Sequence, residues 1–258
     1  MTTTAPANPK PEATDPRRIA LELYFLCVPL IALSAYLMDT RVMTCVIAGN
    51  LALRFLIIGR RADWIFLLIG VVAGGGNDLM SMLKGVYYYT PPSLLKEYGA
   101  PIPIWMLLYW GHIFVSFRQL FQLPVFQGEP PAGKPWAIDK RLIADIIVVV
   151  AFRIIIYNTV RNEPWPTIGF ASVLLLRLLV IPPKKREWLL IVAVMLLGPP
   201  FEAALIGFGL YVYFDPVLGG MPAWLLIYWV FAMPILLKGI FDRIEWSLAR
   251  KQKNPARQ

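Results

Sequence analysis

The chain has 258 residues, of which 58% are hydrophobic, and its mean hydropathy is +0.60. A chain of this size cannot bury so much apolar surface in one soluble core, so the composition excludes an ordinary soluble domain and indicates a membrane protein. The net charge of +9 would suit a nucleic-acid-binding protein. However, the basic residues gather in particular loops, and we expect no nucleic-acid partner.

Residues 1–14 are polar and rich in proline. They lack the apolar side chains that would order them, and we expect a disordered cytoplasmic tail. Eight apolar runs follow, each about long enough to cross a hydrocarbon core of roughly 30 Å. The sequence therefore predicts an all-α, polytopic integral membrane protein with eight transmembrane helices. The runs cover residues 19–38, 43–59, 64–88, 103–122, 142–160, 166–181, 188–213 and 222–241.

Lysine and arginine concentrate before the first run and in the loops after the second, fourth, sixth and eighth runs. By the positive-inside rule, these loops and both termini lie in the cytoplasm. We expect the membrane to be a bacterial inner (plasma) membrane. Two further arginines, Arg54 and Arg177, lie inside the runs near the cytoplasmic boundary. We expect their side chains to snorkel towards water.

The second half of the chain repeats the first. An offset of 124 residues pairs Trp64 with Trp188 and Asp78 with Glu202, and "PIWMLLYW" in the fourth run returns as "PAWLLIYW" in the eighth. Each copy holds four runs, an even number, so the copies share one orientation and a pseudo-two-fold axis along the membrane normal. The predicted segments are a first four-helix repeat over 15–127, a cytoplasmic linker over 128–138, a second four-helix repeat over 139–246 and a basic cytoplasmic tail over 247–258.

Two carboxylic acids lie inside apolar runs. Asp78 follows three glycines and Asn77, and Glu202 follows the sequence "GPP". Each acid lies 14 residues beyond its paired tryptophan, which is about 21 Å along a helix and places both in the outer half of the bilayer. A charged group in hydrocarbon costs on the order of 3 kcal/mol, so two acids at one depth indicate a functional site.

Helical spacing predicts what surrounds these acids. Positions four, seven and eleven residues beyond each acid share its helix face, which adds a glycine and a tyrosine to both stripes. The following run returns from the outside with an aromatic face. We therefore assign candidate catalytic roles to Asp78, Glu202 and His112, and candidate substrate-binding roles to Asn77, Tyr89, Trp105, Tyr109, Tyr213, Trp224 and Tyr228.

The chemistry of this set favours acid-initiated reactions. A carboxylic acid in an apolar site can stay protonated at neutral pH and donate its proton, and aromatic faces stabilise a cation. Simpler explanations also exist: aromatic residues near span ends are typical of interfacial belts, and His112 could only join two helices. The chain has one histidine and no phosphate-binding glycine loop, so we expect no metal and no cofactor.

The stretch "FEAALIGFGLYVYFDPVLGGMPAW", residues 201–224, resembles the membrane carotenoid-biosynthesis family that includes the carotenoid hydratases. A more distant similarity, in the use of intramembrane acids, is to polytopic transmembrane terpene cyclases. Both resemblances imply an isoprenoid lipid substrate. The residues that carry the first resemblance are Glu202, Gly207, Gly209, Tyr211, Tyr213, Asp215, Leu218, Gly219 and Pro222.

The leading hypothesis is an integral membrane enzyme, a lyase or isomerase, that hydrates, cyclises or isomerises an isoprenoid or similar apolar lipid. The alternatives are a proton-coupled carrier, a lipid-binding membrane protein, or a structural membrane subunit without catalysis. The expected partners are membrane lipids, an apolar lipid substrate and further copies of the same chain in a homo-oligomer.

Overall fold

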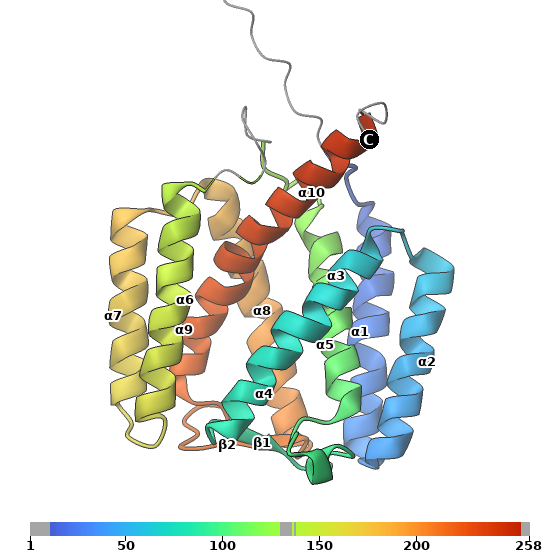
Figure 1. Cartoon of the computed structure of the whole chain (residues 1–258), viewed down its shortest axis with the longest axis vertical. Coiled ribbons are helices and arrows are strands. Elements are labelled where there is room, and N and C mark those ends of the chain that lie inside the picture. The colour runs from blue at the N-terminus through green and yellow to red at the C-terminus, as the bar shows by residue number, and fades with distance from the viewer. Residues whose placement is uncertain (1–10, 130–135, 137, 254–258) are drawn as a thin grey trace, which may run out of the picture.

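The computed structural model describes residues 11–129, 136 and 138–253. Its helices stand side by side and run between two ends of the molecule (Figure 1). In the first half, the third helical segment is bent by a π-helical turn, η1, between α3 and α4. The elements of this half are α1 (Pro16–Tyr36), α2 (Thr40–Ile58), α3 (Asp63–Ile69), η1 (Gly70–Gly74), α4 (Gly75–Leu83), β1 (Tyr87–Tyr89), the 3₁₀ turn η2 (Lys96–Tyr98) and α5 (Ile104–Phe121).

The second half has a similar order of elements, but its π-helical turn lies in a different place. Here the turn, η3, interrupts the last helical segment rather than the third. The elements are α6 (Lys140–Thr159), α7 (Trp165–Val180), α8 (Lys185–Gly207), β2 (Tyr211–Tyr213), α9 (Ala223–Phe231), η3 (Ala232–Leu237) and α10 (Lys238–Lys253).

All eight predicted apolar runs fall on helical segments, and the all-helical, multi-pass membrane architecture is confirmed. The count of eight transmembrane helices is not confirmed, because six helices in the described chain are long and apolar enough to cross a membrane. The exceptions are α5, whose hydropathy is lowered by polar residues such as His112 and Arg118, and α7, which has 16 residues. The six run over Pro16–Tyr36, Thr40–Ile58, Asp63–Leu83, Lys140–Thr159, Lys185–Gly207 and Ala223–Lys251.

Aspartate side chains begin three of these helices. The carboxylate of Asp15 accepts from the N–H of Arg17 at 2.9 Å, and that of Asp139 accepts from the N–H of Leu142 at 2.8 Å. Asp39 caps α2 in the same way. Each carboxylate satisfies a backbone donor that has no partner within its own helix.

Glycines in a left-handed conformation end α4 and α8. Gly85 has φ +68° and Gly209 has φ +79°, values that side chains with a Cβ rarely adopt. The N–H groups of Val86 and Leu210 donate to carbonyls five residues earlier, at 2.9 and 3.0 Å, as in a Schellman motif. The prediction of continuous helices to residues 88 and 213 is therefore wrong, because the chain becomes extended after each glycine.

The helix disturbances before the two acids differ. The glycine run becomes the π-helical turn η1, whereas Pro199 and Pro200 lie inside α8, which continues without interruption. The predicted loosening of the helix is present in the first half only.

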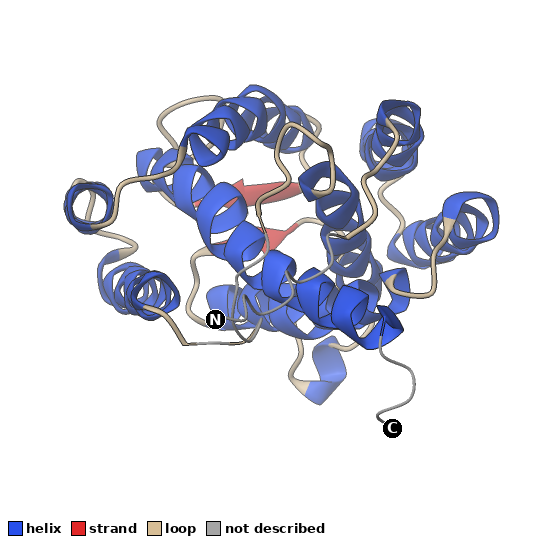
Figure 2. Ribbon diagram, turned by 90° about the horizontal axis from the view of Figure 1, so that it is seen from above, coloured by secondary structure: helices blue, strands red, loops and turns tan. Residues whose placement is uncertain are grey.

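The extended segments β1 and β2 pair as an antiparallel ribbon, with Tyr87 opposite Tyr213 and Tyr89 opposite Tyr211. Figure 2 shows this ribbon within the ring of helices. Alternate residues of a strand point to one side, so all four tyrosine rings face the interior while Tyr88 is half exposed. The ribbon joins the backbone of the first half to that of the second.

A buried ion network joins five helices at the opposite end of the bundle. Arg54 on α2 pairs with Glu22 on α1 and, at 2.5 Å, with Asp63 on α3. Asp63 also pairs with Arg118 on α5, which pairs with Glu245 on α10. In place of snorkelling into water, Arg54 is completely buried, because two carboxylates compensate its charge.

The second half has a smaller version of this arrangement. Arg177 on α7 pairs with Asp145 on α6 at 2.7 Å, and both side chains are buried. The expectation that Arg177 snorkels is likewise wrong. In each half the arginine lies 32 residues after its carboxylate partner on the preceding helix.

The predicted connecting segments are described only in part. Residues 1–10, 130–135, 137 and 254–258 lie outside the described residues. Within the tail expected to be disordered, Thr14 is instead buried, and its hydroxyl donates to the Gln119 side chain at 3.1 Å. At the other terminus, α10 continues into the predicted basic tail as far as Lys253.

Candidate functional site

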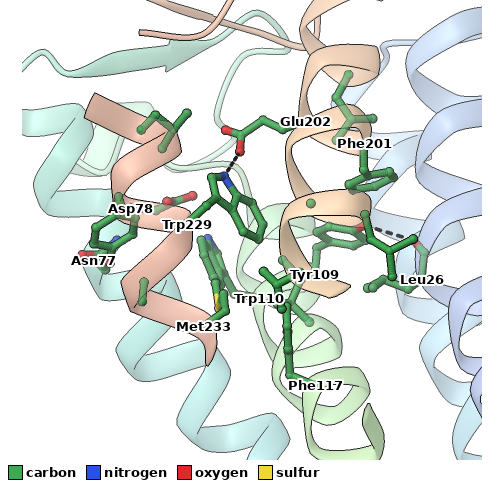
Figure 3. Close-up of a pocket in the computed structure, with 18 of the residues that line it drawn as sticks. Leu26, Asn77, Asp78, Tyr109, Trp110, Phe117, Phe201, Glu202, Trp229 and Met233 are labelled. Atoms are coloured by element: carbon green, nitrogen blue, oxygen red, sulfur yellow. Dashed lines mark hydrogen bonds between the residues drawn. The ribbon is translucent and has the colours of Figure 1, made fainter. Parts of the chain in front are cut away.

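An apolar cavity of about 230 Å³ lies between the two halves. Its wall consists mainly of aliphatic and aromatic side chains from α1, α5, α8, α9 and η3, among them Leu26, Phe201 and Met233 (Figure 3). The cavity extends from Glu22 and Ser116, beside the ion network, to the two predicted acids beside the tyrosine ribbon.

Asp78 is buried on α4, with 3% of its surface exposed. The hydroxyls of Tyr87 and Tyr89 both donate to its carboxylate, that of Tyr89 at 2.7 Å. The sequence predicts Tyr89 on the same helix face as Asp78, but the structure brings it there by another route. The chain turns back at Gly85, and the strand then presents both tyrosines to one carboxylate.

Glu202 is similarly buried on α8 and also accepts from two neutral donors. The Tyr213 hydroxyl donates at 2.7 Å, and the Trp229 indole N–H donates at 2.6 Å (Figure 3). Over the residues that the structure describes, neither Asp78 nor Glu202 belongs to an ion pair. Their partners are hydroxyl and indole groups.

Close glycine–tryptophan packing lies behind each acid. A Cβ at Gly74 would lie 2.5 Å from the Trp110 ring, and one at Gly198 would lie 2.6 Å from the Trp229 ring. Both positions therefore require glycine for the indole to approach the helix. Both indoles approach an acid: the Trp229 N–H donates to Glu202 at 2.6 Å, and the Trp110 N–H lies beside Asp78 without a well-formed hydrogen bond among the described residues.

Most of the remaining predicted site residues line the cavity. Asn77 lies beside Asp78, and the Tyr109 hydroxyl donates to the carbonyl of Leu26 at 3.0 Å (Figure 3). Trp224 and Tyr228 line the wall on α9. The structure therefore gathers Asn77, Asp78, Tyr89, Tyr109, Glu202, Tyr213, Trp224 and Tyr228 around one space.

Two predicted residues are not brought to the cavity. Trp105 is fully buried behind it, with its ring edge-on to Tyr89 at 5.4 Å between centroids. His112 is also fully buried, and neither of its ring nitrogens has a hydrogen-bond partner among the described residues. His112 packs against Tyr109 and is not among the residues that line the cavity.

Sequence reasoning missed three residues that shape the site. Tyr87 is absent from the predicted set, although its place two residues before Tyr89 puts both on one side of an extended strand. Trp229, the last residue of the repeated "PAWLLIYW", is absent as well. Arg153 was overlooked, although a lone arginine in the run 142–160 is itself a signal; it donates to the Tyr228 hydroxyl at 2.7 Å.

The arrangement can bind an apolar molecule and offer it a few polar contacts. Across the described ranges, no group of three or more histidine, cysteine, aspartate or glutamate side chains could hold a metal ion. No family model and no curated protein matches the chain.

The fold is similar to that of an Insig homologue. A crystal structure of the mycobacterial Insig homologue MvINS from Mycobacterium vanbaalenii aligns with a TM-score of 0.53 and 20% identity, over 74% of this chain and 97% of that one. A second structure, a cross-linked trimer of a variant of MvINS, aligns with the same values. The likeness shows a shared fold.

This finding overturns the resemblance to carotenoid hydratases and to terpene cyclases, and the isoprenoid substrate that the resemblance implied gains no support. The resemblance relied on a short pattern of glycine and tyrosine around residues 207–213. That pattern has a local structural cause, since Gly209 ends α8 and Tyr211 and Tyr213 form a strand.

Proposed function

We propose that the protein is a non-catalytic, lipid-binding membrane protein whose cavity holds the apolar part of a lipid. The observation that carries the proposal is the aromatic and aliphatic wall of the 230 Å³ cavity. Ligand sites of this kind are concave and mostly apolar, with a few placed polar groups. The Insig-like fold supports a multi-pass protein of this type.

The bonding of the two acids supports binding rather than turnover. A general acid must reach the atom that it protonates, directly or through one water. Each carboxylate here already accepts from two protein donors. These bonds hold the acids in place and occupy oxygen atoms that would otherwise contact a substrate. His112 lies outside the cavity lining and has no role in this proposal.

We further propose that all eight long helical segments cross the membrane as two parallel four-helix repeats, with both termini in the cytoplasm of a bacterial inner membrane. The repeat offset of 124 residues relates Tyr87 to Tyr211 and Tyr89 to Tyr213. Exchanging the two halves therefore converts the ribbon pair Tyr87–Tyr213 into the other ribbon pair, Tyr211–Tyr89. The glycines that end α4 and α8 correspond in the same way. These correspondences support a two-fold relation through the ribbon.

The neighbour that was solved as a cross-linked trimer supports a homo-oligomer. We propose that this chain also self-associates in the membrane. Native mass spectrometry of the purified protein tests this, and a monomer at every detergent concentration would contradict it.

Lipid extraction from the purified full-length protein tests the main proposal. A Leu26→Trp variant should fill part of the cavity and carry at most half of the lipid per chain, because Leu26 lines the wall. Leu53→Trp is the matched control, since Leu53 is half exposed on the outside of α2. Equal lipid content in wild type and Leu26→Trp, both folded and monodisperse, would contradict a lipid in the cavity.

A further inference from the structure

A second hollow, of about 370 Å³, adjoins the cavity on the outside of the bundle. It lies along α6 and reaches the end of α4, and we call it the α4–α6 groove. Apolar side chains such as Val150 and Ile154 form part of its wall, and Lys84 and Arg153 bring two positive charges to it. Arg153 lines both the groove and the cavity, so it stands where the two spaces meet.

Within the described part of the chain, the positive charges at the groove form no ion pair. Arg153 donates to the Tyr228 hydroxyl at 2.7 Å and lies over the Tyr228 ring at 5.1 Å, both neutral contacts. The described residues contain no ion pair to Lys84, Arg153 or the nearby Arg161. The Arg161 guanidinium is 3.5 Å from where a Cβ at Gly85 would be, beside Lys84.

Arg153 lies deep within the predicted membrane span although it forms no ion pair among the described residues. It lies 13 residues after the start of α6 at Lys140, which is about 20 Å along the helix and within the outer half of a hydrocarbon core of roughly 30 Å. A charged group at that depth is costly unless another charge compensates it. The arginines at the other end of the bundle form ion pairs with carboxylates. Among the described residues Arg153 forms no such pair, and Asp78 attracts it only at longer range across the cavity.

We propose that the α4–α6 groove binds the phosphate of an anionic phospholipid, with one acyl chain passing Arg153 into the cavity. This inference rests on the proposed lipid-binding function. A guanidinium forms paired, charge-assisted hydrogen bonds with phosphate, and a lysine adds a point charge. The apolar wall of the groove suits an acyl chain. Two cations that form no ion pair among the described residues favour an anionic headgroup over a zwitterionic one.

Binding to the full-length protein in detergent tests the proposal. The probes are dioleoyl phosphatidylglycerol, dioleoyl phosphatidylcholine and dioleoylglycerol, which share the same chains, and inorganic phosphate alone. Wild type should bind phosphatidylglycerol roughly tenfold more tightly than phosphatidylcholine. Arg153→Gln should lose most of this tenfold preference for phosphatidylglycerol. Lys84→Gln should reduce the preference to about half of its wild-type value. Arg41→Gln, which removes a charge from α2, a helix across the bundle from α6 (Figure 1), should keep it.

Three results would overturn the headgroup site. The wild type could bind phosphatidylglycerol and phosphatidylcholine equally tightly, or Arg153→Gln could keep the wild-type preference for phosphatidylglycerol. Inorganic phosphate alone could also bind as tightly as phosphatidylglycerol. If Arg153→Gln fails to fold, the exposed Lys84 provides the deciding variant, and an unchanged preference in Lys84→Gln would then overturn the site. If dioleoylglycerol binds as tightly as phosphatidylglycerol, the lipid-filled cavity stands and the headgroup site fails. If none of the three lipids binds, the proposed function itself fails.

Discussion

The buried carboxylates at the two ends of the cavity have different bonding partners. At the end beside α10, Glu22 and Asp63 pair with Arg54, and Asp63 pairs also with Arg118. At the ribbon end, Asp78 and Glu202 accept only from tyrosine and tryptophan. A buried acid is therefore not by itself evidence of a reactive site, since its partners decide what it contributes.

The two kinds of partner differ in energy. Removing one member of a buried ion pair leaves an uncompensated charge and costs about 3–5 kcal/mol. Removing a neutral hydrogen bond costs about 0.5–1.5 kcal/mol. The network end should therefore determine stability, and the ribbon end should tolerate substitution.

The largest effect is expected from Arg54→Met. This change leaves Glu22 and Asp63 without their shared cation and should lower the free energy of unfolding by about 3–5 kcal/mol. Thermal unfolding of the detergent-purified protein measures it, with the exposed Arg41→Met as control. A melting temperature equal to that of the control would show that the network contributes nothing to stability.

A smaller effect is expected from glycine substitution beside the indoles. Gly198→Ala would force the Trp229 ring aside and should cost about 1–3 kcal/mol through overpacking. Gly74→Ala should cost a similar amount, since the clash with Trp110 is equally close. Gly76→Ala is the control, because nothing lies within 4 Å of a Cβ there. If all three variants melt together, the packing around the indoles is looser than the distances indicate.

Conservative changes of the acids should have modest effects. Asp78→Asn and Glu202→Gln keep the shape of each side chain and one accepting oxygen, so each should cost about 1 kcal/mol. Both variants should keep the lipid that co-purifies with the wild type. Loss of all lipid from either folded variant would mean that the carboxylates bind the lipid directly.

The smallest effects on stability are expected from removing the indole N–H groups, and they should differ between the two halves. Trp229→Phe removes the hydrogen bond to Glu202 and should cost about 1 kcal/mol. Trp110→Phe removes an N–H that lies beside Asp78 without a well-formed hydrogen bond and should lower the melting temperature less than Trp229→Phe. A double-mutant cycle of Trp229→Phe with Glu202→Gln measures the bond itself. A coupling energy of zero would show that the 2.6 Å contact does not stabilise the fold.

Sequence patterns predicted the helices well, because apolar runs are local signals. Asp15 and Asp139 begin helices that the hydropathy already indicated. The sequence also predicted that Asp78 and Glu202 lie at one depth, and the structure has both acids lining one cavity.

Other features depend on long-range contacts that no local pattern contains. Helical spacing predicts Gly85 on the same helix face as Asp78, but Gly85 adopts a left-handed conformation and ends α4. Helical spacing then no longer applied to Tyr89. The partners of Arg54 lie on two other helices, so its burial could not be inferred from its position within one run.

The ribbon has a consequence for the route by which the cavity fills. Because β1 and β2 are hydrogen-bonded across the two halves beside Asp78 and Glu202, a molecule arriving from that aqueous face would have to separate a backbone ladder. A lipid can instead arrive sideways, from within the bilayer, without breaking it. Occupancy of the cavity would then follow the mole fraction of that lipid in the surrounding membrane, and would be insensitive to its minute concentration in water.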